Sequence, residues 1–288
     1  MSKKGSLPGL PSSKTPIVLT IVVVTICATW MMPTLGLLIS SFRPKFLISS
    51  SGWWEALVPP FAFTLENYIK VLGQQNVGIS FMNSLIISIP ATILPISIAS
   101  FAAYAFSWMN FKSKEVLFSI ILILLVVPTQ VTLIPILQIF TGMGINGTFA
   151  CVWLAHTVYG IPLAIFLLRN FFMQLPASML ESAFIDGASH PVVFLRLIVP
   201  TSMPAFASLA IFQFMWVWND LLVAMVFLGG TGDVAPLTVR MANLVNSYGQ
   251  GWQILTAAAF ISMILPLIVF FSLQKYYVQG MLAGSVKE

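Results

Sequence analysis

Long apolar runs separated by isolated charges constrain this chain more than any other feature. Only 7% of its 288 residues are charged, and the mean hydropathy is +0.97. So little charge cannot cover a water-exposed surface. About 20 consecutive apolar residues are enough for one helix to cross a bilayer core. The sequence therefore predicts an all-α, multi-pass membrane protein.

Six of these runs are long enough to cross a membrane. The turn-rich stretch TGMGINGT at 141–148 divides one very long run into two. The first run is too long for a signal peptide and has no cleavage site near its end, so we expect it to be retained. The predicted spans are 15–42, 81–108, 116–140, 149–172, 204–228 and 254–273.

Lysines and arginines indicate the orientation. Six spans place both termini on the same side of the membrane. If that side is the cytoplasm, nine positive residues lie inside and four outside, which agrees with the positive-inside rule. We therefore expect a cytoplasmic tail at 1–16, a membrane domain at 17–274 with a cytoplasmic loop at 174–200, and a cytoplasmic tail at 275–288. The net charge of +5 then reflects topology and lipid headgroups, not nucleic acid.

Prolines inside the predicted spans leave two interpretations open. Membrane helices tolerate proline, so the residues can be incidental. Each proline also removes a backbone hydrogen bond and can bend a helix, which would suit a bundle around a central path. The prolines concerned are Pro33, Pro90, Pro95, Pro128, Pro135, Pro162 and Pro266.

Motifs for catalysis and nucleotide binding are absent from the sequence. It contains no Gly-Lys-Ser/Thr phosphate loop, no His-Glu-x-x-His and no Cys-x-x-Cys. Asp186, Ser189 and His190 are triad residue types, but they lie within about one helical turn, whereas a triad needs groups that converge from separate elements. We expect no enzyme activity, no metal and no cofactor on this chain, so the energy for transport would come from a partner or an ion gradient.

The polar stretch LESAFIDGASHPVVFLRLIVP at 180–200 stands between two apolar runs. Residues 177–189 predict an amphipathic helix along the membrane surface, with Met179, Leu180, Phe184 and Ile185 as its apolar residues. Small side chains leave the backbone open to another protein. The alternative is an ordinary interfacial connector with no partner.

This stretch resembles the EAA loop of ABC-importer permeases. In that pattern Glu-Ala-Ala is followed by a glycine one helical turn later and by an Ile-x-Leu-Pro ending. Glu181, Ala183, Gly187, Ile198 and Pro200 match it, while Ser182 replaces the middle alanine and Val199 the leucine. We call residues 174–200 the EAA segment.

Further stretches extend the resemblance to the carbohydrate (maltose-type) branch of these permeases. They are NSLIISIPATI at 83–93, FLLRNFFMQLP at 166–176, FQFMWVWNDLLVAMVFL at 212–228 and QKYYVQGMLAGSVKE at 274–288. The chain most resembles the second permease of such systems. The stretch at 212–228 and the C-terminal tail are similar in sequence to those of α-glucoside and glucosylglycerol importers.

The resemblance implies a type I ABC importer permease fold and a set of partners in a bacterial inner membrane. These are a second, homologous permease, two ATPase subunits that hold ATP and magnesium, and an external solute-binding protein that delivers a sugar. Motion of the ATPases would open the path alternately to each side. Asp186 is either a second docking contact or only a surface charge. The implied ATPase-docking residues are Glu181, Ser182, Ala183, Asp186, Gly187, Ala188 and Pro200.

Polar and aromatic side chains within the spans are candidates for the substrate path. An ionisable residue in a span is a functional hypothesis by default, and aromatic faces beside amides and carboxylates suit a sugar. Asp220 could instead lie near the outer interface and pair locally. We expect the lone His156 to be a hydrogen-bonded packing residue. The path candidates are Trp216, Trp218, Asn219, Asp220, Asn83 and Gln130.

A secondary transporter or channel for a small polar solute is the competing interpretation. Such a protein would more often contain several buried charges for ion coupling, whereas Asp220 is almost alone here. The secondary-transporter interpretation also gives no function to the EAA segment.

Overall fold

The computed structural model describes residues 17–74, 76–229, 232–244 and 251–285. Within these ranges the chain is helical and contains no strand. Three of its four longest apolar helices are α1 (Ile17–Ser41), α4 (Val77–Trp108) and α7 (Phe149–Phe172). The fourth, α14 (Trp252–Ser285), continues past residue 273, where we had expected the last span to end.

Two bent helix pairs provide the remaining candidate spans. α5 (Lys114–Leu124) and α6 (Thr129–Gly142) meet at 101°, and His190–Thr201 meets α11 (Met203–Trp218) at 75°. Counting each pair as one span gives six in the described part of the chain, as predicted. The predicted shape of spans three and five was wrong, since neither is one continuous helix. The predicted bounds of span five, 204–228, were also wrong, because the bent pair covers 190–218 and so includes residues that we had expected in the cytoplasmic loop. Pro128 and Pro204 stand at the two bends, where a missing N–H and a ring clash interrupt the helix.

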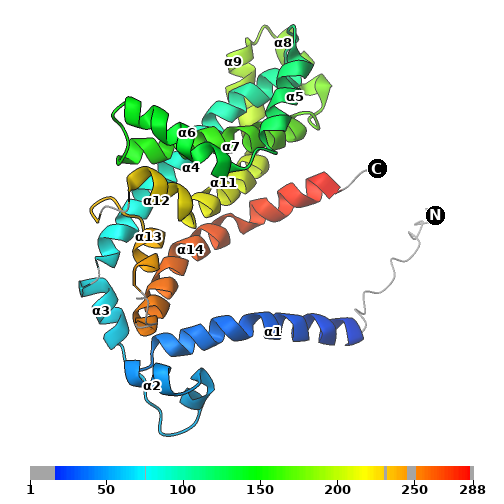
Figure 1. The fold of residues 1–288 in the computed structure, drawn as a ribbon. Helices are drawn as coiled ribbons and strands as arrows, with labels where there is room; N and C mark the ends of the chain where they lie inside the picture. The colour runs from blue at the N-terminus through cyan, green and yellow to red at the C-terminus, as the bar shows by residue number, and fades with distance from the viewer. Residues whose placement is uncertain (1–16, 75, 230–231, 245–250, 286–288) are drawn as a thin grey trace, which may run out of the picture.

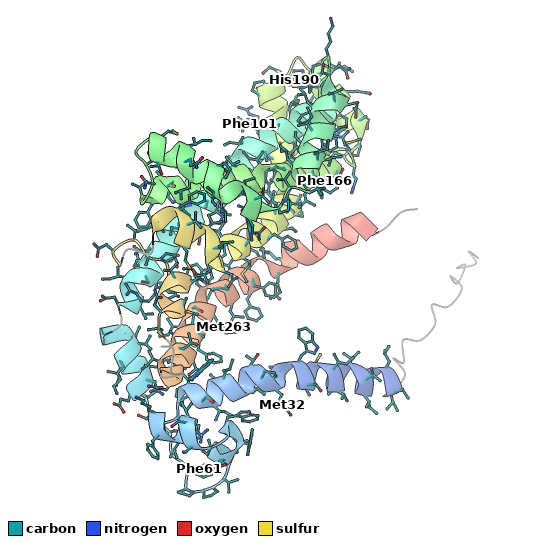
Figure 2. The ribbon with its side chains drawn as sticks, in the orientation of Figure 1. Met32, Phe61, Phe101, Phe166, His190 and Met263 are labelled. Atoms are coloured by element: carbon teal, nitrogen blue, oxygen red, sulfur yellow. The ribbon has the colours of Figure 1, made fainter. Side chains whose placement is uncertain are left out.

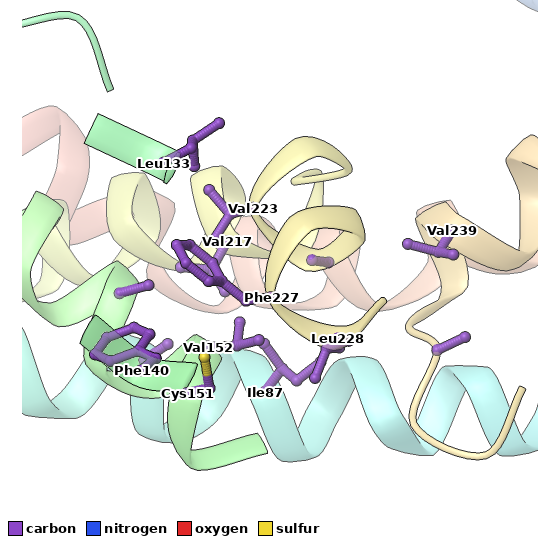
Figure 3. Packing of buried hydrophobic residues seen from close by; sticks show 14 residues of the cluster. Ile87, Leu133, Phe140, Cys151, Val152, Val217, Val223, Phe227, Leu228 and Val239 are labelled. Carbon is purple, nitrogen blue, oxygen red and sulfur yellow. The ribbon is translucent and has the colours of Figure 1, made fainter. Parts of the chain in front are cut away.

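Small residues bring α4 and α7 together along much of their length. Ala91, Ala99 and Ala103 of α4 and Ala155 and Ala164 of α7 are all buried. Small side chains let membrane helices approach closely, and dispersion contacts then hold them. Around this pair, α6, α11 and α12 (Leu222–Leu228) form a buried apolar cluster that includes Phe140, Val217 and Phe227 (Figure 3).

The first helix stands apart from the rest of the bundle (Figure 1). Gly36 and Ser41, close to its C-terminal end, are its buried residues. At that end α1 packs against α14 and the short helix η1 (Trp53–Leu57), where the ring of Trp53 occupies the space beside Gly36. Most of α1 therefore presents apolar side chains to lipid or to another chain.

The two ends of the molecule differ in what they present. One end contains α2 (Lys45–Ser50) and α3 (Glu66–Gln74), and the other contains α8 (Ala177–Ile185) and α9 (His190–Val193) (Figure 1). α13 (Leu237–Ala242) lies between these ends and packs on α4 and α14. Phe61 and His190 mark these opposite ends in Figure 2. The fold thus separates the EAA segment from the loops that follow α1 and α12.

Candidate functional site

The EAA segment forms a short helix with one face packed on the bundle. Leu180 of α8 is only 2% exposed, and Met179 and Ala183 pack on the same cluster of α4, α5 and α7 residues. Glu181 lies on the outward face and is exposed. The four apolar residues that we expected on one face are divided, because Ile185 is 85% exposed. The outward face of α8 therefore combines carboxylates with an uncovered aliphatic side chain.

Gly187 ends α8 in a left-handed conformation. Its φ is +82°, and the amides of Gly187 and Ala188 donate to the carbonyls of Phe184 and Ala183, each at 3.0 Å. This pair of bonds is the Schellman motif, in which glycine is preferred because it has no Cβ to clash. A Cβ added to Gly187 would meet nothing within 4 Å in this chain. The glycine is therefore explained by backbone conformation, and the space beside it is open.

The other small and acidic residues of the segment also have defined positions. Ser182 is exposed and donates to the carbonyl of Ser178 at 2.8 Å. Asp186 is exposed directly before the glycine, whereas Ala188 is half-buried against the bundle. Glu181, Ser182 and Asp186 are thus accessible to a partner, and Ala183 and Ala188 mainly seat the helix.

Pro200 lies in the helical stretch that follows α8 and affects its hydrogen bonding. It lies in α10 (Val199–Thr201), directly after a π-helical turn, η2 (Phe194–Ile198), in which the amide of Val199 donates to the carbonyl of Phe194. A proline cannot donate a hydrogen bond and clashes with the preceding turn, which favours a widened turn. Ile198, the other residue of the motif ending, is fully buried.

A cavity of about 370 Å³ lies at the break between α5 and α6, on the side facing α7 and α11. Trp216 and Gln213 of α11 line it, together with Tyr159 of α7 and Thr132 of α6. The Oγ1 of Thr132 donates to the carbonyl of Thr129 at 2.7 Å and lies 3.1 Å from the Tyr159 hydroxyl. Of the predicted path residues, Trp216 alone belongs to this lining. Tyr159, Thr132 and Thr129 were missed, because only the bend brings α6 against α7.

Asp220 lies in a break between α11 and α12, not within a continuous span. Its carboxylate accepts hydrogen bonds from the amides of Val223 at 3.3 Å and Ala224 at 2.9 Å, in the first turn of α12. An aspartate at this position stabilises the helix start. Asn219, also in the break, donates to the carbonyl of Met215 at 2.8 Å. The aspartate therefore has a local structural partner in addition to any role in transport.

His156 was expected to be hydrogen-bonded, and that expectation is wrong. Its ring is 1% exposed, and neither ring nitrogen has a hydrogen-bond partner. The Nε2 lies 3.7 Å from the Oδ2 of Asp220. The edge of the ring meets Trp216 at a centroid distance of 5.2 Å and an angle of 87°. His156 thus connects the α11–α12 break to an aromatic side chain of the cavity.

The remaining path candidates lie elsewhere. Trp218 is buried, stacks on Phe214, and donates its Nε1–H to the carbonyl of Ser262 on α14 at 3.1 Å. Asn83 is buried and its amide donates to the carbonyls of Asp233 at 2.8 Å and Ala235 at 3.1 Å. Gln130 is exposed on α6 outside the cavity lining. Both buried side chains hold neighbouring elements in place and offer no face to a path.

Among the described residues, no group of three His, Cys, Asp or Glu side chains could hold a metal ion. A multi-pass helical fold with an outward-facing EAA helix and a cavity at a helix break is that of a membrane transport subunit.

Comparison with known proteins identifies the family. Residues 95–283 match the family of binding-protein-dependent transport system inner membrane components. The chain belongs to this family, whose members are ABC transporter permease subunits and not enzymes.

Two relatives and one solved structure are similar over most of the chain. The osmoprotective compounds uptake permease protein GgtD of Synechocystis sp. is 57% identical over 93% of this chain and 91% of its own length. The α-glucoside transport system permease protein AglG of Rhizobium meliloti is 53% identical over 82% of this chain and 63% of its own length. A crystal structure of a bacterial ABC transporter for import of the acidic polysaccharide alginate matches with a TM-score of 0.74. It is 19% identical, and the match covers 94% of this chain and 100% of the other. This match shows the ABC importer permease fold.

Proposed function

We propose that this chain is one of two membrane subunits of an ATP-driven importer for uncharged α-glucosides or glucosylglycerol-like solutes. The two relatives above, at 57% and 53% identity, transport osmoprotective compounds and α-glucosides according to their names. The cavity lining contains no charged residue, which suits a neutral sugar better than an acidic one. The subunit would work in a bacterial inner membrane with both termini in the cytoplasm.

The outward face of α8 is the observation that supports ATPase docking. Glu181, Ile185 and Asp186 are exposed there, while Leu180 anchors the opposite face in the bundle. An apolar side chain surrounded by a polar rim is the usual anatomy of a protein interface. Each ATPase would bind ATP and magnesium, because this chain has no phosphate loop, and would move α8 when it closes.

Exposure of α1 supports a second, homologous permease as partner. The most apolar 18-residue window of this helix has no buried residue, and Trp30 is 81% exposed. A helix that packs so little on its own chain can pack on another. The name of the family supports an external solute-binding protein as the remaining partner.

Charge reversal on α8 tests the proposal. We expect Glu181→Lys to reduce copurification of the ATPase subunit and ATP-dependent uptake of a labelled α-glucoside, with normal membrane insertion. Glu115→Lys is the matched control, because Glu115 is an exposed glutamate in the first turn of α5. Equal effects of the two substitutions would contradict docking at α8.

Removal of the ATPase tests the competing interpretation. An ABC importer loses all uptake when its ATPase subunit is absent or cannot hydrolyse ATP. Uptake that continues under these conditions would identify a secondary transporter or channel instead.

A further inference from the structure

The cavity beside the α5–α6 break has features that simple helix packing does not require. It has a volume of about 370 Å³, within the range of roughly 300–1,000 Å³ that is usual for small-molecule sites. Its lining includes Trp216, Gln213, Tyr159, Thr132 and Thr129, and contains no Lys, Arg, Asp or Glu. The question is whether lipid, water or a solute occupies it.

The broken backbone argues against lipid as the occupant. At the end of α5 the amides of Val126 and Val127 donate only three residues back, at 3.0 and 3.3 Å, and Pro128 has no N–H. The first amides of α6 lack a preceding turn to bond to. Within a bilayer, irregular backbone is tolerated only where protein covers it or where it lines a water-filled cavity. Leu125, Val127 and Thr129 of this break all line the cavity, so polar groups, whether from water, a solute or a partner chain, suit it better than lipid tails do.

Trp216 is fixed in position at the cavity wall. The indole is 39% exposed, so part of its surface is available to a ligand. The buried ring of His156 meets it edge to face, an arrangement that aromatic rings favour. Because His156 lies beside Asp220, whose carbonyl oxygen accepts a hydrogen bond from Thr238 at 2.5 Å, the indole is connected to the first turn of α13.

Polar groups in the cavity are also oriented before any ligand arrives. The Nε2 of Gln213 donates to the carbonyl of Ala91 at 3.1 Å, which fixes the plane of the amide. Gly160 permits this position, since an added Cβ would lie 2.8 Å from that nitrogen. The Thr132 hydroxyl lies 2.7 Å from the carbonyl of Thr129 and 3.1 Å from the Tyr159 hydroxyl, so both hydroxyls are held at the cavity wall and keep lone pairs that can accept from a ligand.

We propose that this cavity is a binding subsite for one uncharged sugar ring of the transported solute. Trp216 provides the face for the C–H side of the ring, and Tyr159, Thr132 and Gln213 provide hydrogen bonds to its hydroxyls. The absence of charge in the lining selects a neutral ring over a uronate. The subsite rests on the proposed import function, and the second permease would close its open side.

Uptake kinetics in the complete importer test the subsite. The probe is radiolabelled maltose, presented by the loaded binding protein to proteoliposomes that contain both permeases and the ATPases. We expect Trp216→Ala to lower uptake about tenfold, whereas Trp216→Tyr retains an aromatic face and most of the uptake. Tyr159→Phe should lower uptake by about threefold, as loss of one neutral hydrogen bond does.

A matched control separates the cavity from the rest of α11. Phe212 lies one turn before Trp216, is 52% exposed, and does not line the cavity. We expect Phe212→Ala to retain uptake within about twofold, as is usual for surface substitutions. Unchanged uptake in Trp216→Ala, or an equal loss in Phe212→Ala, would overturn the subsite.

Thiol labelling gives a second measurement that does not depend on uptake. In a chain with Cys27 and Cys151 replaced by serine, Thr129→Cys should react with a membrane-impermeant thiosulfonate, and maltose trapped in the transporter should slow the reaction. Ile134→Cys is the control and should not react, because the impermeant reagent does not enter lipid. Ile134 lies on α6, is 67% exposed, and is outside the cavity lining. No reaction at position 129, or no protection by maltose, contradicts the proposal.

ATP hydrolysis distinguishes a wrong subsite from a wrong function. If the function is right, maltose-loaded binding protein stimulates ATP hydrolysis in the wild type and in the control Phe212→Ala. Stimulated hydrolysis in the wild type together with normal uptake in Trp216→Ala refutes the subsite alone. Absence of ATPase copurification and of stimulation in the wild type refutes the proposed function.

Discussion

The hydroxyl of Tyr104 lies 2.8 Å from the Nδ1 of His190. This bond joins the last turns of α4 to the first residue of α9, just after the EAA helix. The ring of Phe184, from α8 itself, packs on the same imidazole at a centroid distance of 4.9 Å. The EAA helix is therefore attached to a core span through one histidine as well as through its buried Leu180.

We expect Tyr104→Phe to weaken the transmission of ATPase motion to the bundle. The ratio of ATP hydrolysed to sugar imported should rise by about twofold to tenfold, since one neutral hydrogen bond contributes about 0.5–1.5 kcal/mol. Tyr68→Phe is the control, because the Tyr68 hydroxyl lies 2.8 Å from the Oγ of Ser41 at the opposite end of the molecule. Tyr68→Phe should leave the ratio unchanged. The same ratio in both variants would show that the Tyr104 bond only stabilises the fold.

Substitutions at Gly187 separate backbone conformation from partner contact. Gly187→Ala should destabilise the end of α8 by about 1–2 kcal/mol, because alanine disfavours a positive φ, while Gly187→Asn should be tolerated more easily. If only φ matters, Gly187→Asn retains uptake. If a partner approaches the open space beside the glycine, both variants lose uptake and ATPase copurification.

Gly187→Arg is the stronger test of the same residue. We expect it to abolish transport and to leave membrane insertion intact, because the chain itself has open space at this position. Surface expression and uptake, measured together, check this expectation. Normal uptake by Gly187→Arg would exclude docking at this position.

The sequence was sufficient to predict the four long apolar helices and the short helix in the EAA segment, because both follow from local patterns. The turn-rich stretch at 141–148 and the apolar run after it identified α7 at 149–172 to the residue. Pro176 before α8 and Gly187 after it are the usual signals for a helix start and end. These features depend on residues that are neighbours in the chain.

The broken spans and the cavity could not be derived in the same way. Pro128 was recognised as a possible bend, but nothing in the sequence gives an angle of 101° or shows that Tyr159 would meet Thr132. The Asn219-Asp220 pair was read as polar residues inside a span, although this pair is also a typical signal for a new helix. Periodicity and hydropathy could not distinguish these interpretations, because the residues on both sides are apolar.

We expect Asp220 to affect stability through its contacts with α12. Asp220→Ala removes the acceptor for the amides of Val223 and Ala224 and should cost about 1 kcal/mol, whereas Asp220→Asn retains an acceptor and should cost little. Thermal unfolding in detergent measures the difference. Equal destabilisation by the two substitutions would indicate that Asp220 stabilises the fold mainly through its negative charge beside His156. Uptake by Asp220→Asn tests separately whether the carboxylate belongs to the substrate path.

Close packing between α7 and α11 leads to a last prediction, which needs two substitutions. A Cβ at Gly160 would lie 2.8 Å from Nε2 and 2.9 Å from Oε1 of Gln213. The Gln213 side chain is buried and held by Ala91, so it cannot move aside freely. We expect Gly160→Ala to destabilise the bundle by about 1–3 kcal/mol, as overpacking usually does. In a Gln213→Ala background the same substitution should cost much less, because the obstructing atoms are gone, and a double-mutant cycle of thermal unfolding measures this coupling. Additive effects would mean that the helices separate slightly and that the amide does not determine their spacing.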